Sequence, residues 1–337
     1  MVDESAPSTL ASQDPLLPVT GLIEGFTVSA DGTTSLVEDA ATAEPPDGGF
    51  LWLHLNVSES GELVEKELGL DPMVVRSLLA KETRPRCQHL RGGILINLRG
   101  ANLNAGQRPE NMISVRCYLE ANRLITVRLQ RSVAVEDMRE NYRAGQAHDR
   151  PSQLLIEMIR RLISLLDPIV DGIADSLDAL EHEATRQGDD ERLKNQISAI
   201  RHDSATYRRY LAPMRDAILK LGSRQAAGIT SADLDELHEE GDRAMRIVEE
   251  LDITIERAGV IVDQMDAARD EKMNRNMMLL SVISAVFLPL GFLTGLLGIN
   301  VGGLPGTDDP QAFTIVVVIC LVVGVGAGVF FKARDWI

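Results

Sequence analysis

The chain has 337 residues, of which 45% are hydrophobic, 25% charged and 4% aromatic, so a collagen-like, disulfide-framework or largely disordered protein is excluded. There are 34 Lys and Arg residues against 50 Asp and Glu residues, and the net charge of -16 disfavours a nucleic-acid partner and favours cations. The 3 cysteines lie far apart and are odd in number, which excludes a closed disulfide set and a four-cysteine zinc site.

The N-terminal part of the sequence predicts a flexible tail over residues 1–20 and a mixed α/β domain over 21–150. The tail is small, polar and proline-bearing, and it has no apolar stretch of the kind found in a secretory signal. Strand-like runs follow, with a helical pattern over 62–80 among them. These runs lie at 26–29, 51–57, 94–98, 112–119 and 124–129.

From Val133 the pattern becomes helical, and residues 151–271 are expected to form long cytoplasmic helices. The predicted helices cover 133–143, 152–186, 190–221, and a segment that begins at Ser231. No proline occurs between Ser231 and Pro289, so one helix of about 100 Å can run from the cytoplasm into a membrane. A helix of that length in water needs apolar partners from the preceding helices or from sister subunits.

Residues 272–337 are expected to form a transmembrane region with two spans. Residues 277–298 and 312–331 contain no Asp, Glu, Lys, Arg or His, and as helices they would extend about 33 Å and 30 Å, which matches a bilayer core. Basic residues flank the spans and acidic residues lie in the connector 300–311, which predicts an inner-membrane protein with both termini cytoplasmic. The residues concerned are Lys272, Arg275, Lys332 and Arg334, and Asp308 and Asp309.

The excess negative charge lies in the cytoplasmic part. Four basic and four acidic residues occur from Glu271 onward, so residues 1–270 hold 34 − 4 basic and 50 − 4 acidic residues, a difference that accounts for the whole -16. Such a field raises the local cation concentration, although an acidic surface also simply keeps a protein soluble. Both interpretations stay open from the sequence.

One face of the first span is made of small or polar residues. At heptad spacing it presents Asn274, Met277, Ser281, Ser284, Leu288, Gly291, Gly295 and Gly298, whereas the other positions are mostly bulky and apolar. This stripe fits either close packing between membrane helices or the lining of an ion pathway. Two spans cannot enclose water, so the second interpretation requires several subunits around an axis.

Residues 295–306, at the end of this span, read GLLGINVGGLPG. This stretch resembles the signature of the CorA-type metal ion transporter family, whose Gly-Met-Asn hallmark appears as Gly298, Ile299 and Asn300. The stretch SVISAVFLPL at 281–290 and the TRPR turn at 83–86 are similar to the family's preceding helix and soluble domain. The GIN form and the following glycines resemble the zinc-transporting ZntB branch.

The resemblance implies a homopentamer in the lipid bilayer, with a funnel-shaped cytoplasmic α/β domain and a central pore lined by the first span. Asn300 would stand at the outer mouth, and the transported ion would be zinc or another divalent cation, with proton coupling as one option. The magnesium branch has Met-Pro-Glu where this chain has Leu304, Pro305 and Gly306, so acidic groups of the outer loop would have to come from Asp308 and Asp309. A magnesium, cobalt or nickel channel is the alternative.

A cytoplasmic metal site is predicted where carboxylates and an imidazole share one helical face, at Asp171, Asp175, Asp178 and His182. A solvated acidic face is the competing interpretation. Motifs of hydrolases and of nucleotide-binding loops do not occur in the sequence, so neither an enzyme nor a bound cofactor is expected. The remaining alternative is a membrane-anchored coiled-coil scaffold or sensor.

Overall fold

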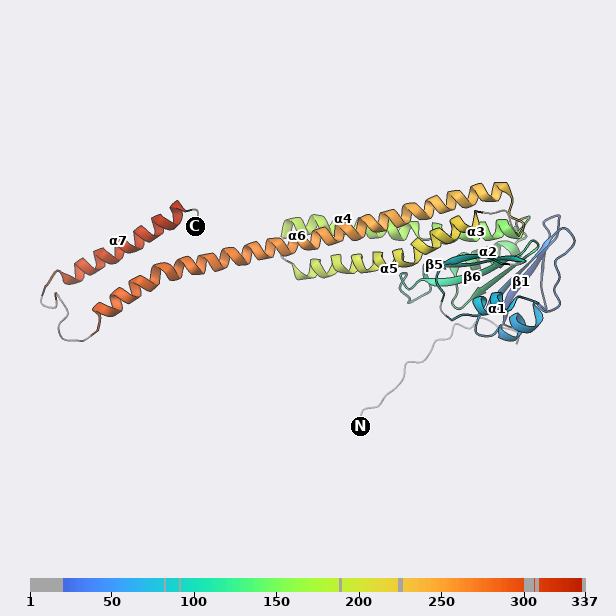
Figure 1. The fold of residues 1–337 in the computed structure, drawn as a ribbon, viewed down its shortest axis with the longest axis horizontal. Helices are drawn as coiled ribbons and strands as arrows, with labels where there is room; N and C mark the ends of the chain where they lie inside the picture. The colour runs from blue at the N-terminus through green and yellow to red at the C-terminus, as the bar shows by residue number, and fades with distance from the viewer. Residues whose placement is uncertain are drawn as a thin grey trace, which may run out of the picture. The chain divides into compact units, whose positions relative to one another are not determined.

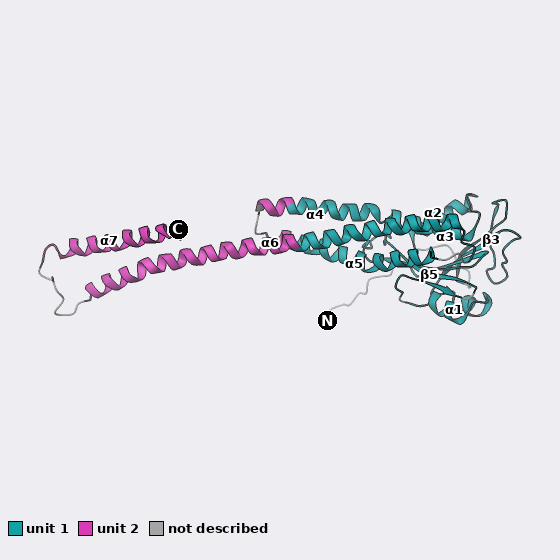
Figure 2. Ribbon diagram, turned by 45° about the horizontal axis from the view of Figure 1, so that its top comes forward, with its two compact units in different colours: residues 1–181, 195–259 teal, residues 182–194, 260–337 magenta. Residues whose placement is uncertain are grey.

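The computed structural model describes residues 21–81, 83–90, 92–187, 190–223, 227–299, 306 and 309–334. It divides into two compact units, one made of residues 1–181 and 195–259 and the other of residues 182–194 and 260–337 (Figure 2). The domain boundaries that the sequence predicts after residues 20, 150 and 271 stay predictions. The helices that begin after residue 150 pack on the sheet and share its core.

The first unit contains a seven-stranded sheet in the order β2-β1-β3-β7-β6-β5-β4 (Figure 1). Its strands pair antiparallel, except that β3 and β7 are parallel. The short edge strand β2 and the opposite edge strand β4 were not anticipated from the sequence. The strands are β1 Leu22–Val28, β2 Thr34–Leu36, β3 Phe50–Asn56, β4 Arg86–Leu90, β5 Gly93–Gly100, β6 Ile113–Leu119 and β7 Arg123–Arg128.

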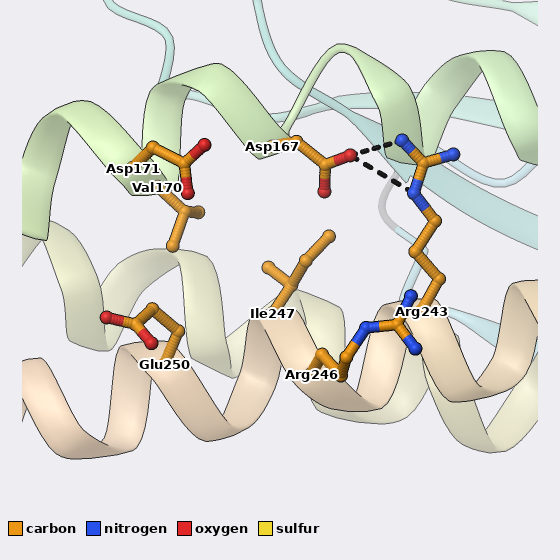
Figure 3. Close-up of a pocket in the computed structure, with 7 residues that line it drawn as sticks. All are labelled: Asp167, Val170, Asp171, Arg243, Arg246, Ile247 and Glu250. Carbon is orange, nitrogen blue, oxygen red and sulfur yellow. Dashed lines mark hydrogen bonds and ion pairs between the residues drawn. The ribbon is translucent and has the colours of Figure 1, made fainter.

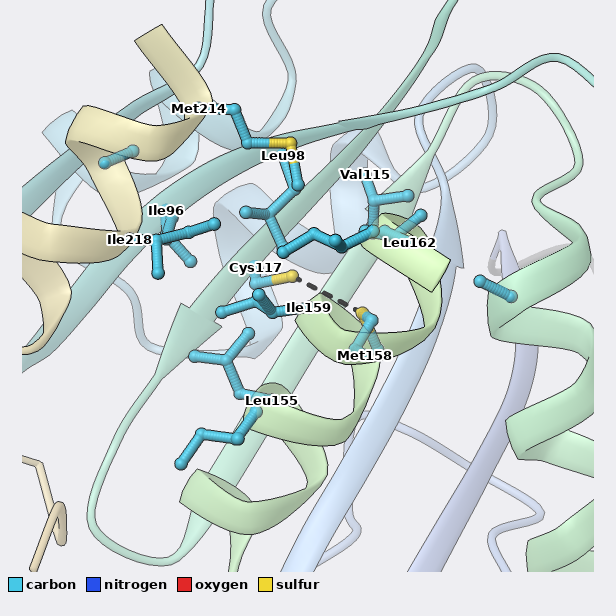
Figure 4. Packing of buried hydrophobic residues seen from close by; sticks show 14 of the residues in the cluster. Ile96, Leu98, Val115, Cys117, Leu155, Met158, Ile159, Leu162, Met214 and Ile218 are labelled. Carbon is cyan, nitrogen blue, oxygen red and sulfur yellow. Dashed lines mark hydrogen bonds between the residues drawn. The ribbon is translucent and has the colours of Figure 1, made fainter. Parts of the chain in front are cut away.

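Both faces of the sheet are buried, so alternate side chains enter two different cores. On β3, Phe50 and Trp52 pack with α2 (Val133–Arg143) and α3 (Pro151–Ser164). Leu51 and Leu53 pack with the π-helical turn η1 (Leu63–Glu67) and with α1 (Pro72–Leu78). Figure 4 shows the first core, where Ile159 and Leu162 of α3 lie among side chains of the sheet and of α5.

The helix predicted over 152–186 is two helices, α3 and α4 (Asp167–Gln187), and that prediction was wrong at the junction. Pro168 explains the break, because its nitrogen carries no hydrogen for the carbonyl of Ser164 and because it disfavours helical backbone in the residue before it. The amide of Leu166 bonds to the Ile163 carbonyl at 2.8 Å instead.

Two longer helices complete the first unit and continue into the second. Helix α5 covers Glu191–Leu221, and α6 covers Ser231–Leu297 without interruption. Within the first unit, Met214 and Ile218 of α5 and Ile247 and Leu251 of α6 are buried in the core shared with the sheet. The α5 residues are thus apolar partners for this part of α6, of the kind that the sequence predicts for so long a helix.

The second unit contains the C-terminal part of α6 and helix α7 (Ala312–Ala333). Both helices are long and apolar enough to cross a membrane, and only 6% and 0% of their apolar windows are buried. These segments are therefore not core helices of the single chain. The predicted fold class is confirmed: an α/β domain, long helices and two C-terminal membrane helices.

Candidate functional site

The small and polar stripe lies on the C-terminal part of α6. The structure describes its residues, which follow one another at intervals of three or four and are exposed along one face of the helix. They are Asn274, Met277, Ser281, Ser284, Leu288, Gly291 and Gly295. Most neighbouring positions are also exposed in the single chain, including Leu280 and Phe287. Exposure in the single chain therefore does not distinguish one face of this part of α6 from another.

The two serine hydroxyls of the stripe donate to their own helix. Ser281 Oγ lies 2.9 Å from the carbonyl of Met277, and Ser284 Oγ lies 2.9 Å from that of Leu280. This back-bonding satisfies each hydroxyl proton and leaves the oxygen lone pairs as acceptors. The stripe thus offers oxygen atoms to a hydrated cation without burying a formal charge.

Two residues modify the backbone beside the stripe. Pro289 lies inside α6 and has no amide hydrogen to donate to the carbonyl of Ala285. At the end of the helix, the amide of Gly298 bonds to the carbonyls of Thr294 at 2.9 Å and Gly295 at 3.2 Å. A Cβ at Gly298 would lie 3.0 Å from the Thr294 oxygen, so glycine suits this tight helix end.

Of the signature residues, Gly298 and Ile299 are described, and Ile299 is exposed. Asn300 and Asp308 lie outside the described residues. Asp309 is described at the start of α7, where its carboxylate accepts the amide of Gln311 at 2.9 Å and its carbonyl accepts that of Ala312 at 3.1 Å. Asp309 therefore contributes to the start of α7, in addition to any influence of its charge on ions.

The predicted cytoplasmic metal site is not assembled. Among the described residues, no group of three or more His, Cys, Asp or Glu side chains is close enough to hold a metal ion. Asp178 accepts a hydrogen bond from Arg257 at 2.7 Å, and Arg257 also bonds to Glu181 at 2.5 Å. One straight helix spreads Asp171, Asp175, Asp178 and His182 over three turns, so no common centre forms.

Asp171 instead lines a groove of about 350 Å³ between α4 and α6 (Figure 3). Figure 3 shows Glu250 of α6 and Asp171 of α4 at the same end of the groove, while Asp167 bonds to Arg243 toward the other end. The groove therefore combines carboxylates with arginine side chains. Its mixed charge does not resemble a dedicated cation site.

The sequence pattern does not predict the ion pairs that fix the N-terminal part of α6 to α3. Asp233, which is 1% exposed, accepts Nη1 and Nη2 of Arg150 at 2.7 and 2.9 Å, Ser152 Oγ at 3.0 Å and the amide of Thr230 at 2.9 Å. Burial acts to raise the pKa of Asp233, but the Thr230 amide and Arg150 lower it below its ordinary value. Thr230 and Asp233 cap the start of α6 reciprocally, but their partners Arg150 and Ser152 at the start of α3 are visible only in the fold.

About two turns further along α3, Arg160 joins three carboxylates. It bonds to Glu157 at 2.7 Å on its own helix, and to Glu236 at 2.7 Å and Glu240 at 2.9 Å on α6. Some acidic residues of the first unit are therefore paired with arginines, and those carboxylates are not available as metal ligands.

A fully buried histidine lies in the sheet. His54 Nδ1 is 2.8 Å from Thr126 Oγ1, which also accepts Trp52 Nε1 at 2.9 Å. Burial first, and then the charges of Arg128 and Arg139, lower the pKa of His54 well below 6.5, so this imidazole is neutral. Burial likewise raises the pKa of the Cys87 thiol to about 11, which makes it a poor metal ligand.

Helix α6 runs without interruption from the α/β domain into the first of two exposed apolar segments, and α7 is the second. This architecture is that of a membrane protein with a large domain outside the bilayer. The chain belongs to the CorA-like Mg²⁺ transporter protein family, whose model matches residues 47–333. This finding confirms the family resemblance seen in the signature.

Several relatives cover almost the whole chain. The divalent cation transporter CmaX of Pseudomonas aeruginosa is 36% identical over 94% of this chain and 97% of its own length. The zinc transport protein ZntB of Yersinia enterocolitica is 30% identical over 91% of this chain and 93% of its own length. The solved structure of full-length CmaX has a TM-score of 0.81 and 34% identity, and the match covers 97% of this chain and 100% of that one.

Proposed function

We propose that the protein carries divalent metal cations across the membrane, with zinc as the principal ion, and that it performs no catalysis. Membership of a transporter family and 30% identity to a zinc transport protein over 91% of the chain support this function. The single observation that carries the mechanism is the stripe on α6, with its self-satisfied Ser281 and Ser284 hydroxyls.

In the proposed assembly, five copies surround a central pore and each contributes the stripe of its α6. Two spanning helices per chain cannot enclose an aqueous path, so a ring of subunits is required. Oxygen atoms at Asn274, Ser281 and Ser284 contact a hydrated ion, and rings of Met277 and Leu288 narrow the path and gate it by dewetting. Gly291 and Gly295 leave room where the helices converge.

Asn300 occupies the outer mouth in this proposal. Five amide oxygens accept hydrogen bonds from the water shell of a divalent ion without the hold of a carboxylate ring. Asp308 and Asp309 raise the cation concentration in the outer loop.

Both termini are cytoplasmic and the membrane is the bacterial inner membrane, as the basic residues that flank the spans favour. Inward movement of a divalent ion gains about 4.6 kcal/mol per 100 mV of membrane potential. The spans contain no ionisable Asp, Glu, Lys, Arg or His over 277–298 and 312–331, so any proton coupling uses groups outside the bilayer.

Zinc flux into reconstituted vesicles tests the proposal. Vesicles containing the protein and a zinc-sensitive dye should fill faster than empty vesicles, and imposing a pH gradient shows whether protons are coupled. Asn274→Leu, on the stripe, should slow filling, whereas Met273→Leu, one residue away on another face, should not. Zinc flux that is independent of the protein under every gradient would reject the zinc assignment.

A magnesium, cobalt or nickel conduit is the second candidate, because the family model is described for Mg²⁺. The same vesicles decide between the two, since an ion that is carried should compete with zinc for entry. A membrane-anchored scaffold would instead show no flux of any of these ions and no effect of Asn300→Ala.

A further inference from the structure

An apolar groove lies on the outer side of the second core. Leu70, Pro72, Val75, Leu79 and Ala80 line it, the charged side chains of Glu65 and Arg76 complete the lining, and its volume is about 560 Å³. The aliphatic side chains at this groove are only partly buried, although they pack against the buried cluster of η1 and α1. The groove is therefore apolar surface that the described residues leave uncovered.

The start of the described chain belongs to the same buried cluster as the elements that form this groove. The carbonyl of Gly21 accepts the amide of Asn56 at 2.9 Å, and a Cβ at Gly21 would collide with the backbone of Glu59 and Ser60. Leu22 belongs to the same buried cluster as the residues of η1 and α1. Glu65, which lines the groove, follows Ser60 by five residues, so the Cα atoms of the two residues are about 17 Å apart at most.

The sequence immediately before Gly21 is apolar, like the groove, and is long enough to extend to it. Residues 15–19 read PLLPV, and they hold three of the five Leu, Ile and Val residues of the first 20 positions. Five extended residues back from Gly21 also span about 17 Å and arrive at Leu16. The two prolines restrict the segment to extended backbone, which reduces the entropy lost on docking. Asp14, next to the segment, is complementary in charge to Arg76.

We propose that the groove binds the chain's own segment Pro15–Val19, with Leu16 inserted between α1 and η1. The segment covers the exposed edge of the second core and ties the start of β1 to α1. This inference is independent of the transported ion and of the pore.

Disulfide trapping tests the proposed contact. In full-length protein carrying Cys320→Ser, the pair Leu16→Cys and Val75→Cys should close within one chain under a mild oxidant, because docking places the two residues within disulfide distance. The native Cys87 and Cys117 are buried and do not compete. The control pair is Leu16→Cys with Leu36→Cys, since Leu36 is exposed on β2 and does not line the groove. The groove pair should react at least about tenfold faster, because a docked residue has the higher effective concentration.

Equal rates for the two pairs would overturn the proposal, and so would a disulfide formed between chains, which would assign the groove to a second copy. Amide exchange provides a second measurement without new cysteines in the groove. Replacing Leu16 and Leu17 with Ser should raise exchange over Met73–Leu79 by about tenfold, the effect expected for the partial burial of a leucine, and leave Val133–Arg143 unchanged. Unchanged exchange at α1 would also reject the docking.

Discussion

The first unit and the membrane helices treat polar groups in opposite ways. In the first unit, charged side chains are numerous and pair with one another between helices, as Arg160 does with Glu236 and Glu240. In the spans, polar groups are few, and the hydroxyls of Ser281 and Ser284 bond to their own helix. The charged side chains of the first unit therefore fix the position of α6 against α3. In the spans, the few polar groups are the ones expected to contact an ion.

Replacing Asn300 with Ala should have the largest effect on the membrane side of this comparison. In a pentamer the change removes five amide oxygens at once, so zinc flux should fall by about a hundredfold while the protein still assembles. Initial rates of vesicle filling, normalised to the amount of folded pentamer, provide the measurement. Wild-type flux from this variant would reject the proposed role of the signature.

Replacing Asp233 with Ala should be the most damaging change on the cytoplasmic side. Loss of this buried carboxylate leaves Arg150 and the cap of α6 without their partner, and we expect about 3 kcal/mol of lost stability. Asp252→Ala removes an ion pair with Arg208 whose side chains are 46% and 48% exposed, and it should cost less than about 1 kcal/mol. Urea unfolding followed through the buried Trp52 measures both, and equal losses would show that burial does not set the value of these pairs.

Ser284→Leu should reduce flux about tenfold, because it replaces an oxygen on the stripe with a bulky apolar group. Ala285→Leu introduces the same side chain one residue away and should leave flux within about twofold of wild type, since successive helical residues point 100° apart. The comparison is between the two variants in one vesicle preparation. A larger loss from Ala285→Leu would place the pathway on a different face of α6.

The effect of His54 should appear through pH. Its pKa is lowered in the folded protein, so the unfolded chain binds the proton first, and stability is lost as pH falls below the unfolded value of 6.5. The loss should be about 1.4 kcal/mol per pH unit until the folded histidine itself titrates. Urea unfolding at a series of pH values should show this slope, and His54→Gln should remove it. A slope that persists in the variant would assign the effect to other groups.

The local patterns of the sequence determined most elements of the fold. The runs at 51–57, 94–98 and 124–129 are dense in apolar and β-branched residues and became β3, β5 and β7. The absence of proline from Ser231 to Pro289 predicted that α6 would continue into the membrane region, as it does. The edge strands β2 and β4 carried too little of this pattern, since a strand with only one neighbour needs less apolar sequence.

The sequence by itself determined the spans, the stripe on α6 and the signature, because each depends on residues that are close in the chain and repeat with the period of a helix. Only the tertiary structure decided which charged side chains pair with one another. Asp178 lies 79 positions from Arg257, and Asp233 lies 83 positions from Arg150, so each pair meets only when the helices pack. A helical face of carboxylates looks the same in sequence whether it faces water, a metal ion or an arginine, and the packed neighbours of that face determine its chemistry.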